Sequence, residues 1–560
     1  MRKGDMMKAI STGTENFKEF IDHDYYYVDK SDFIESALSD KVVLFTRPRR
    51  FGKTLNMSML QYFLSIKEKD NAYLFNGLNI TKNQEIMKYQ NKYPVIFMTF
   101  KDMKGLIFDE QIEQFTFLIS NIIKEHHELL KSDKLDEVDK NKLEKYRSGE
   151  STITEIKNSL LFISRCLKRH YDQKVIILID EYDVPLQSAY LHNYYDEMTN
   201  FMGGVLSSVL KTNDSLEKGI LTGCLKTAKE SIFTGLNNFT VYSIFNKGKT
   251  SRHFGFTQSE IDELLRYYHL EEYQDKIKEW YDGYLFGNVN IYNPWSTLNY
   301  IRQIIQEQDD MMASYWANTS GNDIVYNYIK KGNEVLKKEF EELVQGGSVL
   351  KTIKPELTYR EMEDIYNIYS FLLFTGYLKI KDRVYDDKQE IKLNQYELEI
   401  PNKEVKVIYE NQFQSYFEEY TQNKKEELVE ALRNEEVNKA NELLNDILNH
   451  AVSFYDNYEA FYHGFMIGLL SGYQVYSNRE SGDGRFDIGI KPETILKAYV
   501  VIECKKADKL SSLVQVSQEA AKQIVDRRYL EGIKNEGYLK VKGYGISFYE
   551  KNCWISIVEG

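Results

Sequence analysis

The sequence predicts an α/β protein built from several domains. With 560 residues, 42% of them hydrophobic, the chain is too long for one core and apolar enough for more than one. Residues 1–250 alternate short apolar runs with amphipathic stretches of helical period, the pattern of helices packed on a sheet. A compact α/β segment occupies residues 451–560. Between them we expect a helical lid or winged-helix-like domain over 251–350 and a mixed or helical connector over 351–450.

Buried strands are expected in the first domain, where four runs are short and almost continuously apolar. Strands covered on both faces of a parallel sheet have this composition. The runs are Lys41–Phe45, Tyr93–Met98, Lys174–Ile179 and Lys218–Thr222. Helices are expected over Phe115–Leu130 and Ile153–Tyr171.

The first run leads into a candidate phosphate-binding loop. Gly52-Lys53-Thr54 follows the strand and opens a helix, so that backbone N–H groups and the helix N-terminus can cradle phosphates. Lys53 is expected to reach the terminal phosphates of a nucleotide, and the Thr54 hydroxyl to bind Mg²⁺. We add Arg50 and Gly52 to the residues that contact the nucleotide. Arg47 stands where the first glycine of such loops is normally found.

Two acids, Asp180 and Glu181, end the third apolar run. Asp180 is expected to hold the Mg²⁺ through water, and Glu181 to polarise the attacking water. The alternative is that both acids cap the following turn. Thr222 ends the next strand, where it could sense the γ-phosphate or serve as a cap. Lys226, Lys229 and Arg252 are further candidates for stabilising charge, and no arginine finger can be assigned.

The pattern changes near Ser251, where the expected lid begins. Thr257-Gln-Ser-Glu260 is a capping box that opens a helix. Two aromatic-rich runs, Trp280–Tyr284 and Tyr292–Ser296, follow. In the connector we expect strands at Gly376–Ile380 and Glu404–Tyr409, then charged helices through Glu426–Leu432 and Ala440–Ile447.

The last segment carries a second group of acids. Asp487 follows a glycine-rich turn, and a later apolar run ends in Glu503-Cys504-Lys505. Residues two apart on a strand point to the same face, so Glu503 and Lys505 should project together and Cys504 the other way. If the two segments pair as a hairpin, Asp487 joins them. Two carboxylates can hold Mg²⁺ and a lysine can orient water, which is the minimum for cutting a phosphodiester.

Charge and cysteine usage restrict the class of protein. The net charge of −13 argues against an indiscriminate nucleic-acid coat but leaves room for a local basic groove. Basic clusters occur at Arg47–Arg50, Lys505–Lys506 and Arg527–Arg528. The four cysteines show no CxxC spacing, so we expect neither disulfides nor a zinc site. With neither a signal-peptide core nor about 18 consecutive apolar residues, we expect a cytoplasmic protein without membrane contact.

These motifs together resemble a bacterial family of AAA-ATPase-like proteins. The resemblance lies in Tyr27–Lys30, Arg47–Leu55, Leu178–Asp183, Ala228–Phe233 and Gly235–Asn238. That family carries arginine in place of the first loop glycine, and its members commonly end in a PD-(D/E)xK domain. The resemblance implies a P-loop NTPase core of AAA or STAND type with a helical lid, and a restriction-endonuclease-like α/β domain at the C-terminal end.

The C-terminal stretch is similar to the nuclease superfamily at Phe461–Phe465, Ser477–Gly482, Gly484–Asp487 and Glu503–Lys505. This similarity implies that Asp487, Glu503 and Lys505 form the metal-and-water core. It also implies that a preceding helix supplies Glu459 and a following helix supplies Gln523. From the residues alone, Glu459 could be a surface acid, and Gln523 with Tyr529 could satisfy backbone groups. His463, among aromatic residues, is more typical of a packed side chain than of a base.

We therefore expect a protein that uses ATP and Mg²⁺ and whose nucleotide state regulates a nuclease. DNA is the expected partner before RNA, and a homo-oligomer is possible. Defence against foreign DNA or mobile-element biology is the role that the family analogy suggests. The main alternative is a nucleotide-dependent binding or signalling switch that grips nucleic acid without cutting it.

Overall fold

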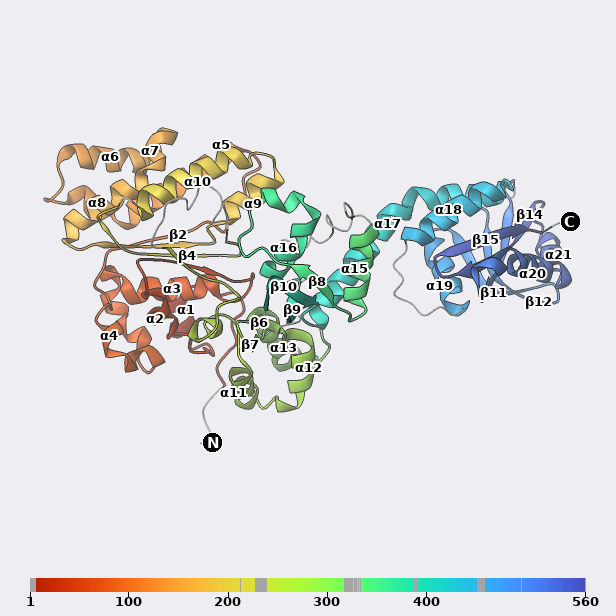
Figure 1. Ribbon diagram of the computed structural model, residues 1–560, viewed down its shortest axis with the longest axis horizontal. Coiled ribbons are helices and arrows are strands. Elements are labelled where there is room, and N and C mark those ends of the chain that lie inside the picture. Colours follow the sequence, from red (N-terminus) through yellow and green to blue (C-terminus); the bar gives the residue numbers. More distant parts are fainter. Residues whose placement is uncertain are drawn as a thin grey trace. The chain divides into compact units, whose positions relative to one another are not determined.

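The computed structural model divides the chain into two compact units (Figure 1). Unit 1 comprises Met1–Ser320 and Gly346–Ile408, and unit 2 comprises Gly321–Gln345 and Tyr409–Gly560. The residues that the structure describes are 7–211, 213–226, 239–316, 326, 330, 332, 334–385, 391–450, 459–494 and 496–558. No helix within these ranges is both long and apolar enough to cross a bilayer.

Unit 1 is built on a parallel sheet of five strands in the order β2-β3-β4-β1-β5. The strands are β1 (Val42–Thr46), β2 (Val95–Thr99), β3 (Val175–Asp180), β4 (Leu216–Gly223) and β5 (Phe239–Tyr242). Every residue of β1 and β3 is buried, which confirms the strands expected from continuous apolar runs. The sequence reasoning did not anticipate β5, whose residues are only half-buried.

Helices cover both faces of this sheet (Figure 1). One face carries α1 (Phe17–Asp22), α2 (Phe33–Ala37), α3 (Lys53–Leu64) and α4 (Gln84–Met87). The other carries α5 (Phe108–Glu125), α6 (Glu137–Ser148), α7 (Ile153–Lys157), α8 (Ser159–Tyr171) and α10 (Tyr195–Leu210). The helix expected over Ile153–Tyr171 is therefore interrupted at Asn158, and α9 (Val184–Leu191) follows the acidic end of β3.

The expected lid begins with α11 (Gln258–Tyr268), and its predicted capping box is present because Thr257 and Glu260 bond to each other's backbone N–H. A hairpin of β6 (Tyr284–Phe286) and β7 (Val289–Ile291) lies between α12 (Gln274–Tyr281) and α13 (Pro294–Glu307). Apolar and aromatic side chains of α11, α12 and α13 form one core cluster.

The predicted connector is shared between the units. Residues up to Ile408 belong to unit 1 and contain α16 (Ile368–Thr375) and a sheet ordered β8 (Val349–Thr352), β10 (Ile391–Glu399), β9 (Lys379–Tyr385). The strand expected at Gly376–Ile380 overlaps the start of β9. The strand expected at Glu404–Tyr409 is wrong, because these residues open the helix α17 (Lys403–Arg433). Val405, Ile408 and Tyr409 are buried at helical spacing, which a short apolar run does not distinguish from a strand.

Unit 2 contains a mixed sheet of five strands in sequence order, β11-β12-β13-β14-β15. Its strands are β11 (Gln474–Ser481), β12 (Gly484–Lys491), β13 (Tyr499–Lys506), β14 (Val541–Tyr549) and β15 (Asn552–Ile557), and only β13 and β14 pair in parallel. Besides α17, the described residues of this unit form the helices α15 (Glu334–Val344), α18 (Val437–His450), α19 (Glu459–Leu469), α20 (Leu513–Asp526) and α21 (Tyr529–Asn535).

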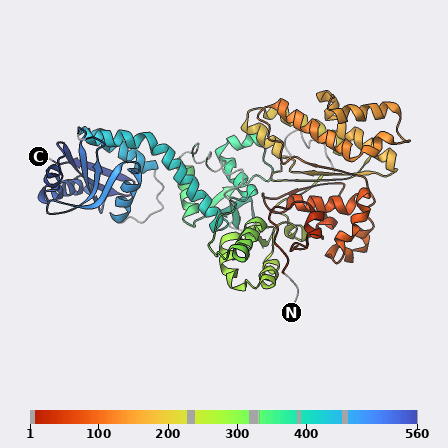
Figure 2. The same cartoon turned by 180° about the vertical axis from the view of Figure 1, so that it is seen from behind.

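Two hydrophobic clusters pack on the sheet of unit 2. One joins α17, α18 and α19 to side chains such as Ile488 and Ile502, and the other joins α20 and α21 to Phe486 and Val501. Figures 1 and 2 show the helices and strands of this unit from opposite sides. Short 3₁₀ segments complete the fold at Ile66–Phe75, Asn79–Lys82, His127–Lys131, Lys249–Arg252, Glu271–Tyr273, Arg360–Glu363, Ile365–Asn367 and Leu510–Ser512.

The backbone of α20 lies close to the sheet at Gly545, which provides a test of the fold. A Cβ at Gly545 would collide with the backbone of Ser517 and Ala521 in α20. We expect Gly545→Ala to destabilise unit 2 by about 1–3 kcal/mol, since the rigid helix backbone must shift. Gly468→Ala is the control, because nothing lies within 4 Å of the new Cβ in α19. Thermal unfolding of the full chain should show a lower Tm for the first variant and an unchanged or higher Tm for the second, and equal Tm values would contradict this packing.

Candidate functional sites

The predicted phosphate loop lies between β1 and α3. Gly52 is the N-cap residue of α3 and has a φ of 82°, a left-handed conformation that glycine adopts without a Cβ penalty. The Lys53 side chain is buried, and its Nζ donates to the carbonyl oxygens of Arg47 at 3.2 Å and Pro48 at 3.0 Å. Lys53 also forms an ion pair with Glu181 at 3.2 Å. Its ammonium group therefore lies against the loop that it is expected to serve.

Arg47 explains how the loop forms without its first glycine. The side chain is fully buried, and its guanidinium donates to the carbonyl oxygens of Thr46 (2.7 Å), Tyr242 (2.9 Å) and Thr250 (2.8 Å). It also lies over the ring of Phe254, 5.4 Å from the centroid. Burial lowers the pKa of Arg47 to about 9, so the side chain stays charged at neutral pH. Arg47 thus ties the start of the loop to the end of β5 and to the segment before α11.

Asp180, at the end of β3, brings the predicted magnesium residues together. Its carboxylate accepts hydrogen bonds from the hydroxyls of Thr54 (2.8 Å), Thr222 (2.5 Å) and Thr99 (3.3 Å). Burial and the neighbouring charge of Glu181 raise the pKa of Asp180 to about 6. Thr54 and Asp180 are the pair that would hold a nucleotide's Mg²⁺, which prefers hydroxyl, carboxylate and water oxygens.

Glu181 and Thr222 complete this edge of the sheet. Glu181 has a φ of 54°, and its N–H lies 3.4 Å from the Thr222 hydroxyl. The turn after β4 is held by Asp183, which accepts from the backbone N–H groups of Cys224 (2.9 Å) and Leu225 (3.0 Å). Thr222 therefore faces Asp180 and does not cap a helix.

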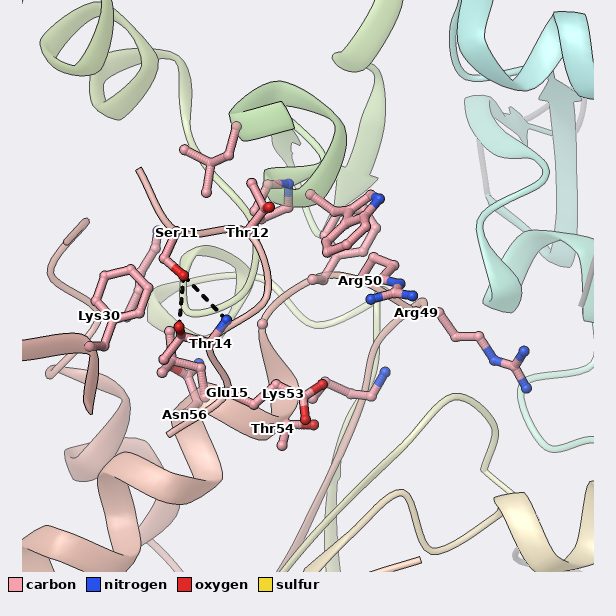
Figure 3. A pocket seen from close by; sticks show the side chains of 18 of the residues that line it. Ser11, Thr12, Thr14, Glu15, Lys30, Arg49, Arg50, Lys53, Thr54 and Asn56 are labelled. Atoms are coloured by element: carbon pink, nitrogen blue, oxygen red, sulfur yellow. Dashed lines mark hydrogen bonds between the residues drawn. The ribbon is translucent and has the colours of Figure 1, made fainter. Parts of the chain in front are cut away.

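A cavity of about 420 Å³ opens over the loop (Figure 3). Its lining includes Arg50, Gly52, Lys53, Thr54 and Glu181. The sequence reasoning missed the other walls, which come from Ser11–Glu15, Tyr26–Val28, Lys101 and the start of α13 at Pro294 and Trp295. Tyr27 and Val28 belong to a predicted family motif and Pro294 and Trp295 to an aromatic-rich run, but nothing in the sequence assigned these residues to the nucleotide site.

The basic residues proposed to stabilise charge differ in their exposure and in their contacts. The exposed Arg50 guanidinium lies 4.1 Å from the centre of the Trp295 ring, a cation–π contact across the cavity wall. Lys226 pairs with Glu356, and Arg252 is exposed. Lys229 lies outside the described residues, as do the motifs at 228–233 and 235–238.

In unit 2 the predicted hairpin forms, and Asp487 lies where its regular pairing ends. Strands β12 and β13 pair from Ile490 to Ile488, opposite Val500 to Ile502. One residue beyond, the Asp487 carboxylate accepts from the backbone N–H of Cys504 at 2.8 Å. The side chain of Asp487 thus bridges to β13 in place of a ladder hydrogen bond.

Glu503 is the more buried acid of the pair. It is 5% exposed and accepts a hydrogen bond from the Gln523 side chain of α20. Gly545 pairs with Glu503 in β14, and its missing side chain lets α20 come close enough for this contact. Cys504 is buried in the cluster on the opposite face, which confirms the predicted alternation along the strand. Lys505 is half-buried.

His463 in α19 supports the backbone at Asp487. Its Nε2 lies 3.1 Å from the Asp487 carbonyl oxygen, which can only accept, and 3.3 Å from the Ser477 hydroxyl. This contact agrees with a packed, hydrogen-bonded histidine. Glu459 is the first residue of α19, but its side chain lies outside the described residues. Within the described part of the chain, no group of three or more His, Cys, Asp or Glu side chains gathers as a metal site.

Comparison with known proteins agrees with both regions. Residues 11–233 match the family described as "Predicted AAA-ATPase", and residues 457–557 match the PD-(D/E)XK nuclease superfamily. The chain carries an AAA-ATPase-like domain followed by a PD-(D/E)XK nuclease superfamily domain, so the predicted resemblance is confirmed. It is also 26% identical over 322 residues to a protein of Azotobacter chroococcum mcd 1 described as "Uncharacterized protein in vnfD 5'region". That match covers 56% of this chain and 54% of the relative.

The setting of Arg47 predicts that restoring the usual loop glycine is harmful. Arg47→Gly removes the donors of three hydrogen bonds to main-chain carbonyls. Each carbonyl left unsatisfied in a buried place costs about 1–3 kcal/mol. We therefore expect a clear drop in Tm for Arg47→Gly and little change for the control Arg50→Ala, whose side chain is exposed. An Arg47→Gly protein as stable as the parent would show that the loop does not depend on this side chain.

Proposed function

We propose that this protein binds and hydrolyses ATP and that its nucleotide state regulates a Mg²⁺-dependent nuclease in unit 2. The observation that supports the proposal is that the Asp487 carboxylate accepts from the N–H of Cys504, the residue after Glu503, at the end of the β12–β13 pair, in a chain that also carries a candidate phosphate loop. We take DNA as the preferred substrate and a bacterial cytoplasm as the setting, with a role in defence or mobile-element biology.

At the nucleotide site, each predicted residue has a chemical task. Lys53 would contact the terminal phosphates, and Thr54 with Asp180 would hold Mg²⁺, which neutralises charge on the phosphates. Glu181 would orient and polarise the attacking water. Arg50, on the cavity wall beside Trp295, would contact the bound nucleotide, and Thr222 would respond to the γ-phosphate through its hydrogen bond to Asp180.

At the nuclease site, Asp487 and Glu503 would hold Mg²⁺, which activates water and stabilises charge on the phosphodiester. Lys505 follows Glu503 by two residues on β13, so it would orient the water from the same face. Gln523 positions Glu503 through their hydrogen bond. Glu459 stays a prediction as a further acid. The alternative function is a nucleotide-dependent switch that binds nucleic acid without cutting it.

A buried carboxylate supports the regulatory part of the proposal. Glu404 is fully buried, and its Oε1 accepts from the Ser296 hydroxyl at 2.8 Å and the Trp316 N–H at 2.9 Å. Ser296 lies in the first turn of α13, next to Pro294 and Trp295, which line the nucleotide cavity. A displacement of Pro294 and Trp295 would therefore change the hydrogen bond between Ser296 and Glu404.

Glu404 in turn belongs to the first turn of α17, which begins in unit 1 and continues into unit 2. The residues before the helix are also anchored, since Asn402 donates to the Asp282 carbonyl at 2.8 Å. A Cβ at Gly283 would collide with the Pro401 carbonyl. The start of α17 is thus held by residues of the two aromatic-rich runs, Trp280–Tyr284 and Tyr292–Ser296. Because α17 continues into unit 2, a change at the nucleotide cavity could be transmitted along this helix.

The two activities can be separated with matched variants of the full chain. Wild type, Lys53→Ala and the double variant Asp487→Asn/Glu503→Gln are incubated with plasmid, single-stranded DNA and RNA, with and without Mg²⁺ and ATP. We expect Mg²⁺-dependent cleavage by wild type, loss of ATP hydrolysis and of the ATP effect in Lys53→Ala, and loss of cleavage alone in the double variant. If wild type hydrolyses ATP but cuts no substrate under any condition, the switch without cleavage becomes the better description.

The Glu404 contacts predict a variant that uncouples the two sites. Glu404→Ala should bring the ratio of cleavage rates with and without ATP close to one while leaving ATP hydrolysis measurable, because Ser296 and Trp316 lose their shared acceptor. Ser296→Ala should lower the ratio less. Glu404→Gln keeps an acceptor oxygen and should retain the ratio. A wild-type ratio in Glu404→Ala would rule out this path.

The stability of the Glu404 variants at two pH values tests whether Glu404 is buried as described. Burial raises the pKa of Glu404 to about 7 from an ordinary value of 4.5. The fold thus favours the protonated acid, and the stability that this group contributes at low pH is lost as the pH rises towards 7. Glu404→Gln should therefore gain Tm relative to wild type at pH 8 more than at pH 5.

A further inference from the structure

Arg527 is the C-cap residue of α20, one turn after Gln523, whose side chain donates to Glu503 of the acid pair. The Arg527 N–H donates to the Gln523 carbonyl at 3.0 Å. Residues four apart at the end of a helix lie on the same side. The backbone of Arg527 is therefore on the side of α20 from which Gln523 reaches Glu503.

The β11–β12 turn packs directly against Arg527. The Asp483 N–H donates to the Arg527 carbonyl at 2.9 Å, and a Cβ at Gly482 would collide with that same carbonyl. A Cβ at Gly484 would lie 3.7 Å from Arg527 Cδ and 3.1 Å from the Tyr529 hydroxyl. The stem of the arginine thus runs past Gly484, three residues before Asp487, and its backbone is fixed on both sides.

Tyr529 is a neighbour of both Arg527 and the two acids. Its hydroxyl donates to the Arg485 carbonyl at 2.8 Å. Burial raises the pKa of Tyr529, and the charges of Glu503 and Asp487 raise it further, whereas Arg527 lowers it. The hydroxyl therefore lies within electrostatic range of both carboxylates and of Arg527.

Neighbouring arginines are engaged in ion pairs, but Arg527 is not. Arg485 pairs with Glu480 at 2.7 Å, Arg479 pairs with Glu536 at 2.8 Å, and Arg528 lies 3.9 Å from Asp483. Across the described residues, the exposed Arg527 side chain makes neither an ion pair nor a hydrogen bond. Its guanidinium is thus available to a ligand.

We propose that Arg527 binds a backbone phosphate of the nucleic acid, next to the phosphodiester held at Asp487 and Glu503; this inference rests on the proposed nuclease function. A guanidinium can donate two parallel hydrogen bonds to phosphate oxygens. It also offsets the repulsion that two carboxylates exert on a polyanion. Because the contact is to the backbone, it positions the strand and carries no base preference.

Arg528→Ala is the matched control for Arg527→Ala, since it removes the adjacent arginine that already faces Asp483. Binding of a fluorescein-labelled DNA duplex to the full-length variants is measured by anisotropy across a salt series. Ca²⁺ replaces Mg²⁺ because it also takes oxygen ligands but does not demand octahedral geometry, which should favour binding without turnover. We expect Arg527→Ala to bind about tenfold more weakly at low salt and to reduce the slope of log K against log salt by about one. Arg528→Ala should change both less, and Arg527→Lys should restore most of the slope.

The outcomes separate this inference from the nuclease proposal. Arg527→Ala with the wild-type affinity and slope overturns the inference, as does wild type that binds neither DNA nor RNA. Weaker binding by Arg527→Ala together with a wild type that cuts nothing supports the phosphate site and overturns the nuclease. In a cleaving wild type, we expect Arg527→Ala to raise KM about tenfold with kcat nearly unchanged, and an unaltered KM overturns the inference alone.

Discussion

The hydrogen bonds of the Asp180 carboxylate are the interaction on which the candidate site of unit 1 depends. Isolated charge in a protein interior is costly, and Asp180 is buried at the end of β3. The hydroxyls of Thr54, Thr99 and Thr222 make this burial possible, and they come from α3, β2 and β4. One acid therefore fixes the strand ends and the start of the phosphate-loop helix at once. The order β2-β3-β4-β1 permits this, since β4 separates the acidic strand from the loop strand and supplies Thr222 between them.

In unit 2, the two acids Asp487 and Glu503 are also held by hydrogen bonds, but these come from a backbone N–H and a glutamine side chain. Asp487 lies one residue beyond the last β12–β13 pair, and its carboxylate takes the Cys504 N–H that a ladder would otherwise bind. Glu503 is held from the other side by Gln523, which reaches it because Gly545 lets α20 lie close to the sheet. Each acid is thus oriented by a group from another element. On the proposed function, such contacts would hold the two acids in place before a metal binds and so reduce the cost of binding it.

Local sequence patterns predicted much of this structure. The features that they did not predict depend on contacts between residues far apart in the sequence. The apolar runs of β1 and β3, the Thr257 capping box and the β12–β13 hairpin depend on neighbours in sequence, so they could be recognised. Glu404–Tyr409 was mistaken for a strand because its apolar residues fit both periods, and the buried Glu404 finds its partners near residues 296 and 316. Arg47 looked like a departure from a loop pattern, but it binds carbonyls of Tyr242 and Thr250, about two hundred residues away. The cavity walls at Ser11–Glu15 and Trp295 are likewise assembled only by the fold.

On the proposed function, the ion pair between Lys53 and Glu181 would connect nucleotide binding to hydrolysis. Burial alone would lower the pKa of Lys53, but the groups around it, Cys224 first and then Glu181, Asp180 and Asp183, outweigh burial and raise it. Lys53 thus remains charged, and Glu181 is its nearest acidic partner at 3.2 Å. On the proposed function, a terminal phosphate would compete with Glu181 for the lysine because it carries more negative charge. Glu181 would then be released from this ion pair and could turn towards the attacking water. The same competition would act at a cavity that Trp295 lines, and the neighbouring Ser296 donates to Glu404 in the first turn of α17.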